Sequence, residues 1–245
     1  MNVLITGASS GIGYELAKTY ALHNHELILT GRNKKALQKL QKELSTKTKI
    51  VVADLATKKG IDIIKKECSN IDCLINNAGL GDYDRFDKAD ENKIQSMIDV
   101  NITALTQLTR EVIPHLLKKK NQTHIINIAS VAGFMPGPQM AAYFATKNYV
   151  LSLSEALAEE LAHTTIAVTT ICPGPVNTQF TKTANIKDDK SFKNGATPAQ
   201  IAQFTYESMK KKKRVAVYGF SNKLLVQLVR FLPRKVVTQL VNKVQ

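Results

Sequence analysis

The chain is poor in the residues that build disulfide-bonded or metal-bound folds: it has no tryptophan and only three cysteines. Cys68, Cys73 and Cys172 are odd in number and show no C-x-x-C spacing, which predicts neither a disulfide framework nor a zinc site. The five histidines are scattered and offer no set of metal ligands. No apolar run approaches the ~18–20 residues of a membrane-spanning helix. We therefore expect no bound metal and no membrane-spanning segment.

Acidic side chains are also scarce. The 245 residues carry 34 Lys and Arg against 20 Asp and Glu, a formal net charge of +14. This balance favours anionic partners, namely a phosphorylated cofactor, acidic lipid or nucleic acid, unless the lysines simply form a solvated surface. The basic runs 118–120 and 210–214 hold no interleaved aromatic residue and lie at predicted helix ends, where lysine complements the helix dipole. Nucleic acid is therefore the less favoured partner.

Short apolar runs alternate with amphipathic stretches along the chain. This alternation predicts a single doubly wound, Rossmann-type α/β domain with a mostly parallel, seven-stranded sheet. The first strand begins so early that we expect no signal peptide and a cytoplasmic protein. The predicted strands are Val3–Thr6, Glu26–Thr30, Lys49–Ala53, Cys73–Asn76, His124–Ala129, Ala167–Cys172 and Val215–Gly219. Helical stretches are expected to begin near Gly11, Lys34, Thr57, Glu91, Tyr143 and Pro198.

A glycine-rich turn, T-G-A-S-S-G-I-G at 6–13, follows the first strand and opens a helix. Glycine allows a sharp turn and a close approach to a pyrophosphate, and a helix N-terminus offers free N–H groups. The alternative is that these glycines serve only tight helix–strand packing. The turn predicts a dinucleotide site formed by Gly7, Ser9, Ser10, Gly11, Ile12 and Gly13.

The end of the second strand, L-I-L-T-G-R-N, bears on which dinucleotide binds. Gly31 occupies the position where a carboxylate would bind the ribose hydroxyls of NAD, and Arg32 follows. A guanidinium there can pair with the extra phosphate of NADP, so we predict NADP over NAD, although Arg32 could merely face solvent. Asp54 and Leu55 end the third strand. Asp54 could accept a hydrogen bond from the adenine amino group or cap the helix starting at Thr57.

Tyr143 and Lys147 lie one helical turn apart in Y-F-A-T-K, and Ser130 ends a predicted strand. A tyrosine phenol has a pKa near ~10, and a neighbouring ammonium lowers it. Such a phenol can donate a proton to a nascent alkoxide, while Ser130 holds the carbonyl oxygen. The three residues predict acid–base chemistry on a carbonyl or alcohol.

With N-N-A-G at 76–79, Asn101 in D-V-N-I-T-A and P-G-P-V-N-T at 173–178, the chain resembles the short-chain dehydrogenase/reductase family over essentially its whole length. The resemblance implies that Ser130, Tyr143 and Lys147 are catalytic and that Asn101 holds a water linking the lysine to solvent. It implies cofactor contacts from Asn77, Ala78, Gly79, Pro173, Gly174, Val176 and Thr178, and a substrate lid at about 179–197. Some members that use NADP have a basic residue at the position of Ser10, so Arg32 carries the NADP prediction largely alone.

These observations predict hydride transfer between NADP(H) and a carbonyl or secondary alcohol. The alternative is a non-catalytic NADP-binding redox sensor or scaffold, which would have no need of the tyrosine acid. An apolar substrate pocket is suggested by Phe134, Met135, Met140, Phe180 and Ile186, although core or interface packing explains them equally well.

The last segment, 221–245, is a basic, amphipathic extension of the catalytic domain 1–220. It has five basic residues, no acidic one, and Pro233 near its middle, which predicts two short amphipathic helices. They could pack on a partner subunit or the substrate pocket, which leads us to expect a homodimer or homotetramer. Alternatively, they could lie on an anionic membrane as a peripheral contact, or pack on their own domain.

Overall fold

The computed structural model describes residues 1–186, 192 and 194–244. Its centre is a seven-stranded sheet in the order β3-β2-β1-β4-β5-β6-β7, and every pairing is parallel. The single α/β domain and the seven predicted strands are confirmed. The strands are β1 (Asn2–Thr6), β2 (Glu26–Gly31), β3 (Thr48–Val52), β4 (Cys73–Asn76), β5 (Thr123–Ile128), β6 (Ile166–Cys172) and β7 (Val215–Val217).

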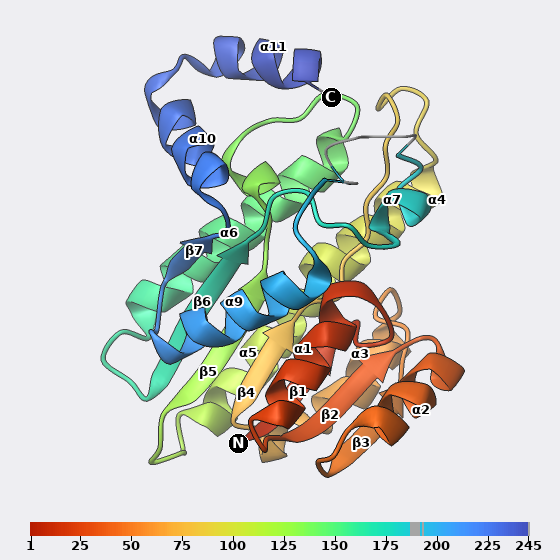
Figure 1. The fold of residues 1–245 in the computed structure, drawn as a ribbon, viewed down its shortest axis with the longest axis vertical. Helices are drawn as coiled ribbons and strands as arrows, with labels where there is room; N and C mark the ends of the chain where they lie inside the picture. Colours follow the sequence, from red (N-terminus) through yellow and green to blue (C-terminus); the bar gives the residue numbers. More distant parts are fainter. Residues whose placement is uncertain (187–191, 193, 245) are drawn as a thin grey trace.

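Helices cover both faces of this sheet, which is why its strands consist mainly of Val, Ile and Leu. Alternate residues of β1 point to opposite layers: Val3 and Ile5 join one core with α1, α2 and α9, and Leu4 joins the other with α3, α5 and α6. Figure 1 shows α1 and α9 side by side across one face. These helices are α1 (Gly11–Leu22), α2 (Lys34–Glu43), α3 (Lys58–Lys65), α5 (Leu105–Leu116), α6 (Ala141–Glu160) and α9 (Pro198–Lys210).

The helical stretch expected from Glu91 is divided into three parts. Helix α4 (Glu91–Ile98) passes into a π-helical turn, η2 (Asp99–Ala104), before α5 begins. A π turn is undetectable in the spacing of apolar residues because it changes the helical period for only one turn. The remaining short elements are the 3-10 turns η1 (Cys68–Asn70) and η3 (Val131–Phe134) and the helix α7 (Phe180–Thr183).

The topology of the sheet positions the functional site. After β3 the chain returns to the centre, so β4 pairs with β1 and the direction of winding reverses there. In such sheets ligands bind at the carboxyl ends of the strands beside this reversal. The glycine turn after β1 and the N-N-A-G segment after β4 both lie at that edge.

The C-terminal segment forms two helices, α10 (Phe220–Phe231) and α11 (Arg234–Val244), separated near Pro233 as expected. They stand beyond the carboxyl edge of the sheet, away from α1 and α9 (Figure 1). Val226 and Val237 are buried and anchor the two helices to the rest of the domain. Among the described residues, no helix is both long enough and apolar enough to cross a bilayer.

Candidate active site

A cavity of about 1350 Å³ opens at the carboxyl edge of the sheet. The structure brings most of the predicted cofactor and catalytic residues together in its wall. Those residues are Gly7, Ser9, Ser10, Gly11, Ile12, Arg32, Asp54, Leu55, Asn77, Ala78, Gly79, Ser130, Tyr143, Lys147, Pro173, Gly174, Val176 and Thr178. Gly13 and Asn101 do not line the cavity; Gly13 packs against Gly7, and Asn101 lies beside Gly79.

The glycine turn has the backbone that its sequence requires. Gly7 and Gly11 have φ values of +66° and +57°, a region that side-chain-bearing residues rarely adopt. Gly13 has a different role: a Cβ there would lie 2.3 Å from the Gly7 carbonyl oxygen. The packing interpretation therefore applies to Gly13. Ser10 makes no side-chain cap at α1, so the first N–H groups of the helix have no side-chain acceptor and can bind a phosphate.

Hydrogen bonds hold this turn against the segment after β4. The Thr6 hydroxyl accepts from the N–H groups of Asn77 and Ala78, both at 2.9 Å. In return, the Asn77 amide donates to the carbonyl oxygen of Thr6 at 2.9 Å. The two turns therefore form one rigid wall of the cavity.

Arg32 and Asp54, which were predicted to contact the cofactor, line the cavity beside the glycine turn. Arg32 lines the cavity with an exposed side chain. A Cβ at Gly31 would lie 3.2 Å from the Ser9 hydroxyl oxygen, so this position is tightly packed as well as uncharged. Asp54 does not cap α3, because Thr57 accepts from the Gly60 N–H instead. The capping alternative is therefore wrong. Asp54 accepts from the Ala56 N–H at 3.0 Å and stays in the cavity wall.

Ser130, Tyr143 and Lys147 meet at the other end of the cavity. The Ser130 hydroxyl accepts from the Ala132 N–H at 3.1 Å and donates to the Pro173 carbonyl oxygen at 3.4 Å. It also lies close enough to the Tyr143 phenol to lower the pKa of that group. The Lys147 Nζ lies 5.8 Å from the centre of the Tyr143 ring and donates to the Ile128 carbonyl oxygen at 2.9 Å. A proton donor, a hydroxyl and an ammonium therefore share one small volume.

The electrostatics of this trio differ from the expectation. Burial raises the pKa of Tyr143 to about 12, against the lowering effect of Ser130. Burial also lowers the pKa of Lys147 to about 8, a shift opposed by Cys172. The expected lowering of the phenol pKa by Lys147 is absent: the effect of burial outweighs that of Ser130, and Lys147 is not among the groups that shift the phenol. The protein alone holds the phenol protonated, the form that can donate.

Asn101 lies in the π turn η2 and is almost fully buried. Its amide bonds both backbone groups of Leu80, with the oxygen accepting at 2.8 Å and the nitrogen donating at 2.9 Å. A Cβ at Gly79 would touch both Lys147 Nζ and Asn101 Oδ1, at 3.5 and 3.6 Å. Gly79 therefore lies beside both the lysine and Asn101, and the water that the resemblance implies there stays a prediction.

The lid side of the cavity is aromatic and apolar. Phe180 of α7 packs on Tyr143 with ring centres 5.4 Å apart, and Met135, Met140 and Ile186 line the same wall. Phe134 does not; it borders a separate small hollow beside Val226. Within the expected lid at 179–197, residues 187–191 and 193 lie outside the described residues.

Sequence reasoning did not assign individual residues of the C-terminal helices to the cavity. Asn222, Leu225, Leu240 and Val241 line it. The amide of Asn222 occupies space that only a glycine leaves at Gly174, where a Cβ would lie 2.5 Å from the Asn222 Nδ2. The tail was expected to pack on the pocket or a partner, but spacing alone did not indicate which of its residues turn inward.

Comparisons with known proteins agree with this geometry. The family model described as short chain dehydrogenase matches residues 1–189. An uncharacterized oxidoreductase of Staphylococcus epidermidis is 36% identical over 193 residues, covering 77% of this chain and 84% of that protein. The NADP-dependent 3-hydroxy acid dehydrogenase of Shigella flexneri is 36% identical over 215 residues, covering 83% and 86%. A short-chain dehydrogenase from Sphingobium yanoikuyae, solved in complex with NADPH, has a TM-score of 0.84 and 30% identity, covering 94% and 93%.

The family match extends over most of the 245 residues and includes the glycine turn, Ser130, Tyr143 and Lys147. On this evidence the chain belongs to the short-chain dehydrogenase/reductase family of oxidoreductases.

Proposed function

We propose that this protein reversibly transfers a hydride between NADP(H) and a carbonyl compound or secondary alcohol, with Tyr143 as the general acid and base. One observation carries the proposal. A single cavity holds the glycine turn and Arg32 at one end and the trio of Ser130, Tyr143 and Lys147 at the other. A dinucleotide spanning that cavity would bring its reactive end beside a proton donor.

The wall of the cavity suits a dinucleotide, and Arg32 favours NADP over NAD. Gly7 and Gly11 bring the backbone close to a pyrophosphate, and the uncapped start of α1 supplies N–H donors. Arg32 would pair with the ribose phosphate, since a guanidinium binds phosphate through two parallel N–H bonds. The relatives that are named for NADP or solved with NADPH support this choice.

When bound, the cofactor supplies or accepts the hydride. In the direction of reduction, Ser130 holds the carbonyl oxygen through its hydroxyl, and Tyr143 donates its phenol proton to the same oxygen as the alcohol forms. Lys147 would then stabilise the phenolate that remains and, as the resemblance implies, bind the nicotinamide ribose. Phe180 covers Tyr143 and excludes water from this end of the cavity.

The experiment is oxidation of NADPH by the purified protein across a panel of aldehydes and ketones, with NADH in parallel. We expect turnover with at least one apolar carbonyl, faster with NADPH, and its loss in Tyr143→Phe. Tight NADPH binding without turnover of any carbonyl or alcohol would favour the alternative of a non-catalytic sensor or scaffold.

A further inference from the structure

The two C-terminal helices expose an unusual amount of apolar surface. Among the described residues, thirteen large apolar side chains are exposed, and eight of these fall between 220 and 240. Phe220 and Phe231 are 82% and 84% exposed, more than any other large apolar side chain in that set. The eight are Phe220, Leu224, Leu225, Leu228, Phe231, Leu232, Val236 and Leu240. Apolar surface of this extent on two consecutive helices indicates a binding surface.

The exposed side chains of α10 form a stripe rather than a scatter. Phe220, Leu224, Leu228 and Phe231 recur at spacings of four, four and three, which places them on one side of the helix. Val226, on the opposite side, is 3% exposed and already anchors the helix to the domain. The stripe is therefore not needed to pack α10 on its own protein.

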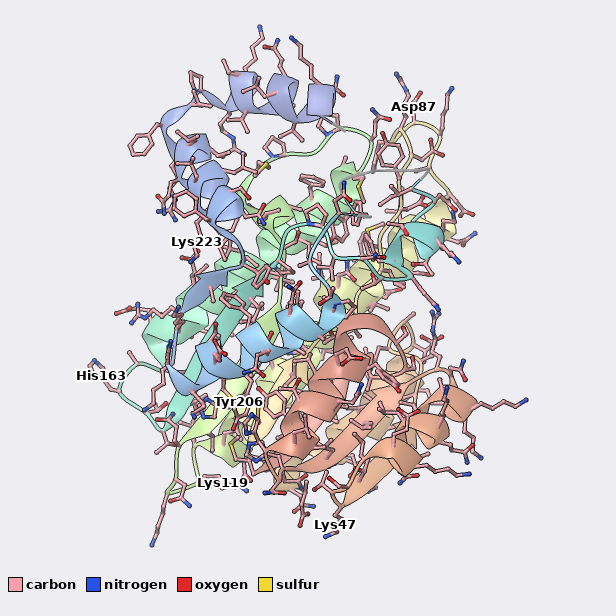
Figure 2. All side chains as sticks on the ribbon, in the orientation of Figure 1. Lys47, Asp87, Lys119, His163, Tyr206 and Lys223 are labelled. Carbon is pink, nitrogen blue, oxygen red and sulfur yellow. The ribbon has the colours of Figure 1, made fainter. Side chains whose placement is uncertain are left out.

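Positive charge is concentrated in the same part of the chain. Residues 208–245 carry ten Lys and Arg and no Asp or Glu, but the five at 210–214 precede β7 and lie at the opposite edge of the sheet. The other five lie on α10 and α11: Lys223, Arg230, Arg234, Lys235 and Lys243. Figure 2 shows Lys223 projecting outward at the foot of α10.

Two occupants could cover such a surface, and charge distinguishes them. If a second copy of this chain docked through the same two helices, the five basic side chains of each copy would meet, ten positive charges in all. Neither copy has an Asp or Glu on these helices to neutralise them, so the charges would repel. A bilayer containing acidic phospholipid accepts the apolar stripe at its interface and neutralises the flanking lysines and arginines. We propose that α10 and α11 dock this protein peripherally on an anionic membrane.

Docking through these helices would also orient the cavity. Leu225 and Leu240 are 42% and 48% exposed, and both line the cavity as well. The proposed docking surface is therefore continuous with the rim of the cavity. If the proposed function holds, apolar carbonyl compounds dissolved in the bilayer would reach Tyr143 from this side.

The test is cosedimentation of the full-length protein with vesicles of phosphatidylcholine, with and without phosphatidylglycerol. We expect binding only to the anionic vesicles, and loss of roughly tenfold or more in partition for the double variant Leu228→Ser with Phe231→Ser. The matched control is Leu22→Ser with Leu117→Ser. Both leucines are exposed and end helices at the opposite edge of the sheet, so this variant should bind normally.

A second pair of variants separates local charge from total charge. Arg234→Glu with Lys235→Glu should weaken partition by about tenfold or more. Lys211→Glu with Lys212→Glu changes the net charge equally but lies before β7, at the opposite edge of the sheet, and should have little effect. Equal losses from both pairs would overturn the proposal, as would no binding to anionic vesicles. It would also be overturned if the Leu228 and Phe231 variant dissociated a dimer but left vesicle binding intact. None of these measurements depends on turnover, so their failure is distinct from failure of the proposed function.

Discussion

At the scale of single residues, burial acts in opposite directions on the two titrating groups of the site. It raises the pKa of Tyr143 to about 12 and lowers that of Lys147 to about 8, because a poorly solvated site disfavours both the phenolate and the ammonium. The free protein therefore holds a neutral phenol beside a readily neutralised amine. That state is suited to proton donation, the half of the chemistry that carbonyl reduction requires.

Tyr143→Phe tests the assignment of the acid. The variant keeps the ring that packs on Phe180 and removes only the transferable proton, so turnover should fall by ~10²–10⁴. NADPH binding, measured by fluorescence titration, should stay near normal. Tyr149→Phe is the control, because Tyr149 lies on the same helix and bonds Thr106 outside the cavity. Retention of more than about a tenth of turnover in Tyr143→Phe would require another acid.

Arg32→Ala tests the choice of cofactor. Loss of a charge-assisted contact of ~1.5–3 kcal/mol should weaken NADPH binding by roughly ten- to a hundredfold and leave NADH nearly unchanged. Dissociation constants for both cofactors measure this directly. Lys35→Ala removes an equally exposed cation nearby that does not line the cavity, and should affect neither. Equal affinities for NADPH and NADH in the unaltered protein would contradict the prediction.

The shifted pKa of Lys147 predicts how stability depends on pH. Between the folded value of about 8 and the usual 10.5, the unfolded chain keeps a proton that the folded protein has lost. The free energy of unfolding therefore gains a contribution that rises with pH, by at most ~1.4 kcal/mol per pH unit. The burial penalty is fully present below pH 8 and fades above it. Lys147→Met should lack this contribution.

The quantity to compare is the difference in free energy of unfolding between the wild-type protein and Lys147→Met at each pH. Burial raises the pKa values of Cys68 and Cys73, and these thiols lower stability above pH 9 in both proteins alike. Burial also raises the pKa of Cys172, but Lys147 lowers it, so this thiol contributes differently in the variant and is part of the measured difference. We expect urea denaturation without cofactor to show that the difference in free energy of unfolding between wild type and Lys147→Met changes by ~1–2 kcal/mol from pH 7 to about 9.5. The change should favour the wild-type protein. Parallel pH profiles would contradict the prediction, and Lys35→Met should follow wild type throughout.

At the scale of elements, a buried carboxylate connects the lid to the loop after β4. Asp82 accepts from the Lys93 ammonium of α4 at 3.2 Å and from the Asn185 amide at 3.1 Å. Asp82→Ala should release the segment after α7, and tryptic cleavage at Lys182 should accelerate roughly three- to tenfold. Asp72→Ala breaks an equivalent pair with Lys119 at the far end of the molecule (Figure 2) and should leave that cleavage rate unchanged.

The strands were predictable from sequence because each is a short apolar run bounded by polar residues. Cys73–Asn76 was predicted to the residue, whereas the end of β7 at Val217 was overestimated by two residues. The π turn and the four-residue helix α7 were not predicted, since neither is long enough to impose a period on the sequence. Elements with a repeating burial pattern are visible in sequence, and single turns are not.

The site was predictable to a similar degree and for a related reason. Residues in local motifs, such as Gly7 or Tyr143, can be located by spacing alone. Asn222 and Leu240 reach the cavity only because the chain returns across it after β7, and no local spacing encodes that return. The difference between Phe134 and Met135 is of the same kind: adjacent apolar residues, of which only the second turns toward the cavity.

At the scale of the whole molecule, charge and function are distributed unevenly. The sheet, the glycine turn and the proposed catalytic trio lie within residues 1–217, whereas most of the net positive charge and the exposed apolar surface follow Glu207. A homodimer or homotetramer stays a prediction of the sequence. Sedimentation of the intact protein in the absence of lipid measures it.

Truncation after Phe220 tests whether the C-terminal helices shape the substrate end of the cavity and leave the cofactor end unaffected. It removes α10 and α11, and with them Asn222, Leu225, Leu240 and Val241 from the cavity wall, but it leaves every strand and the residues around the glycine turn. The truncated protein should fold and bind NADPH within about threefold of wild type, because it keeps the glycine turn and Arg32, which would hold the dinucleotide. Its KM for apolar carbonyls should rise by roughly tenfold, since a wall of the substrate end is lost.

The double variant Leu225→Ser with Leu240→Ser should reproduce the rise in KM in a full-length chain. An unchanged KM in both proteins would show that the tail does not shape the substrate site, and loss of NADPH binding would place it in the cofactor site instead.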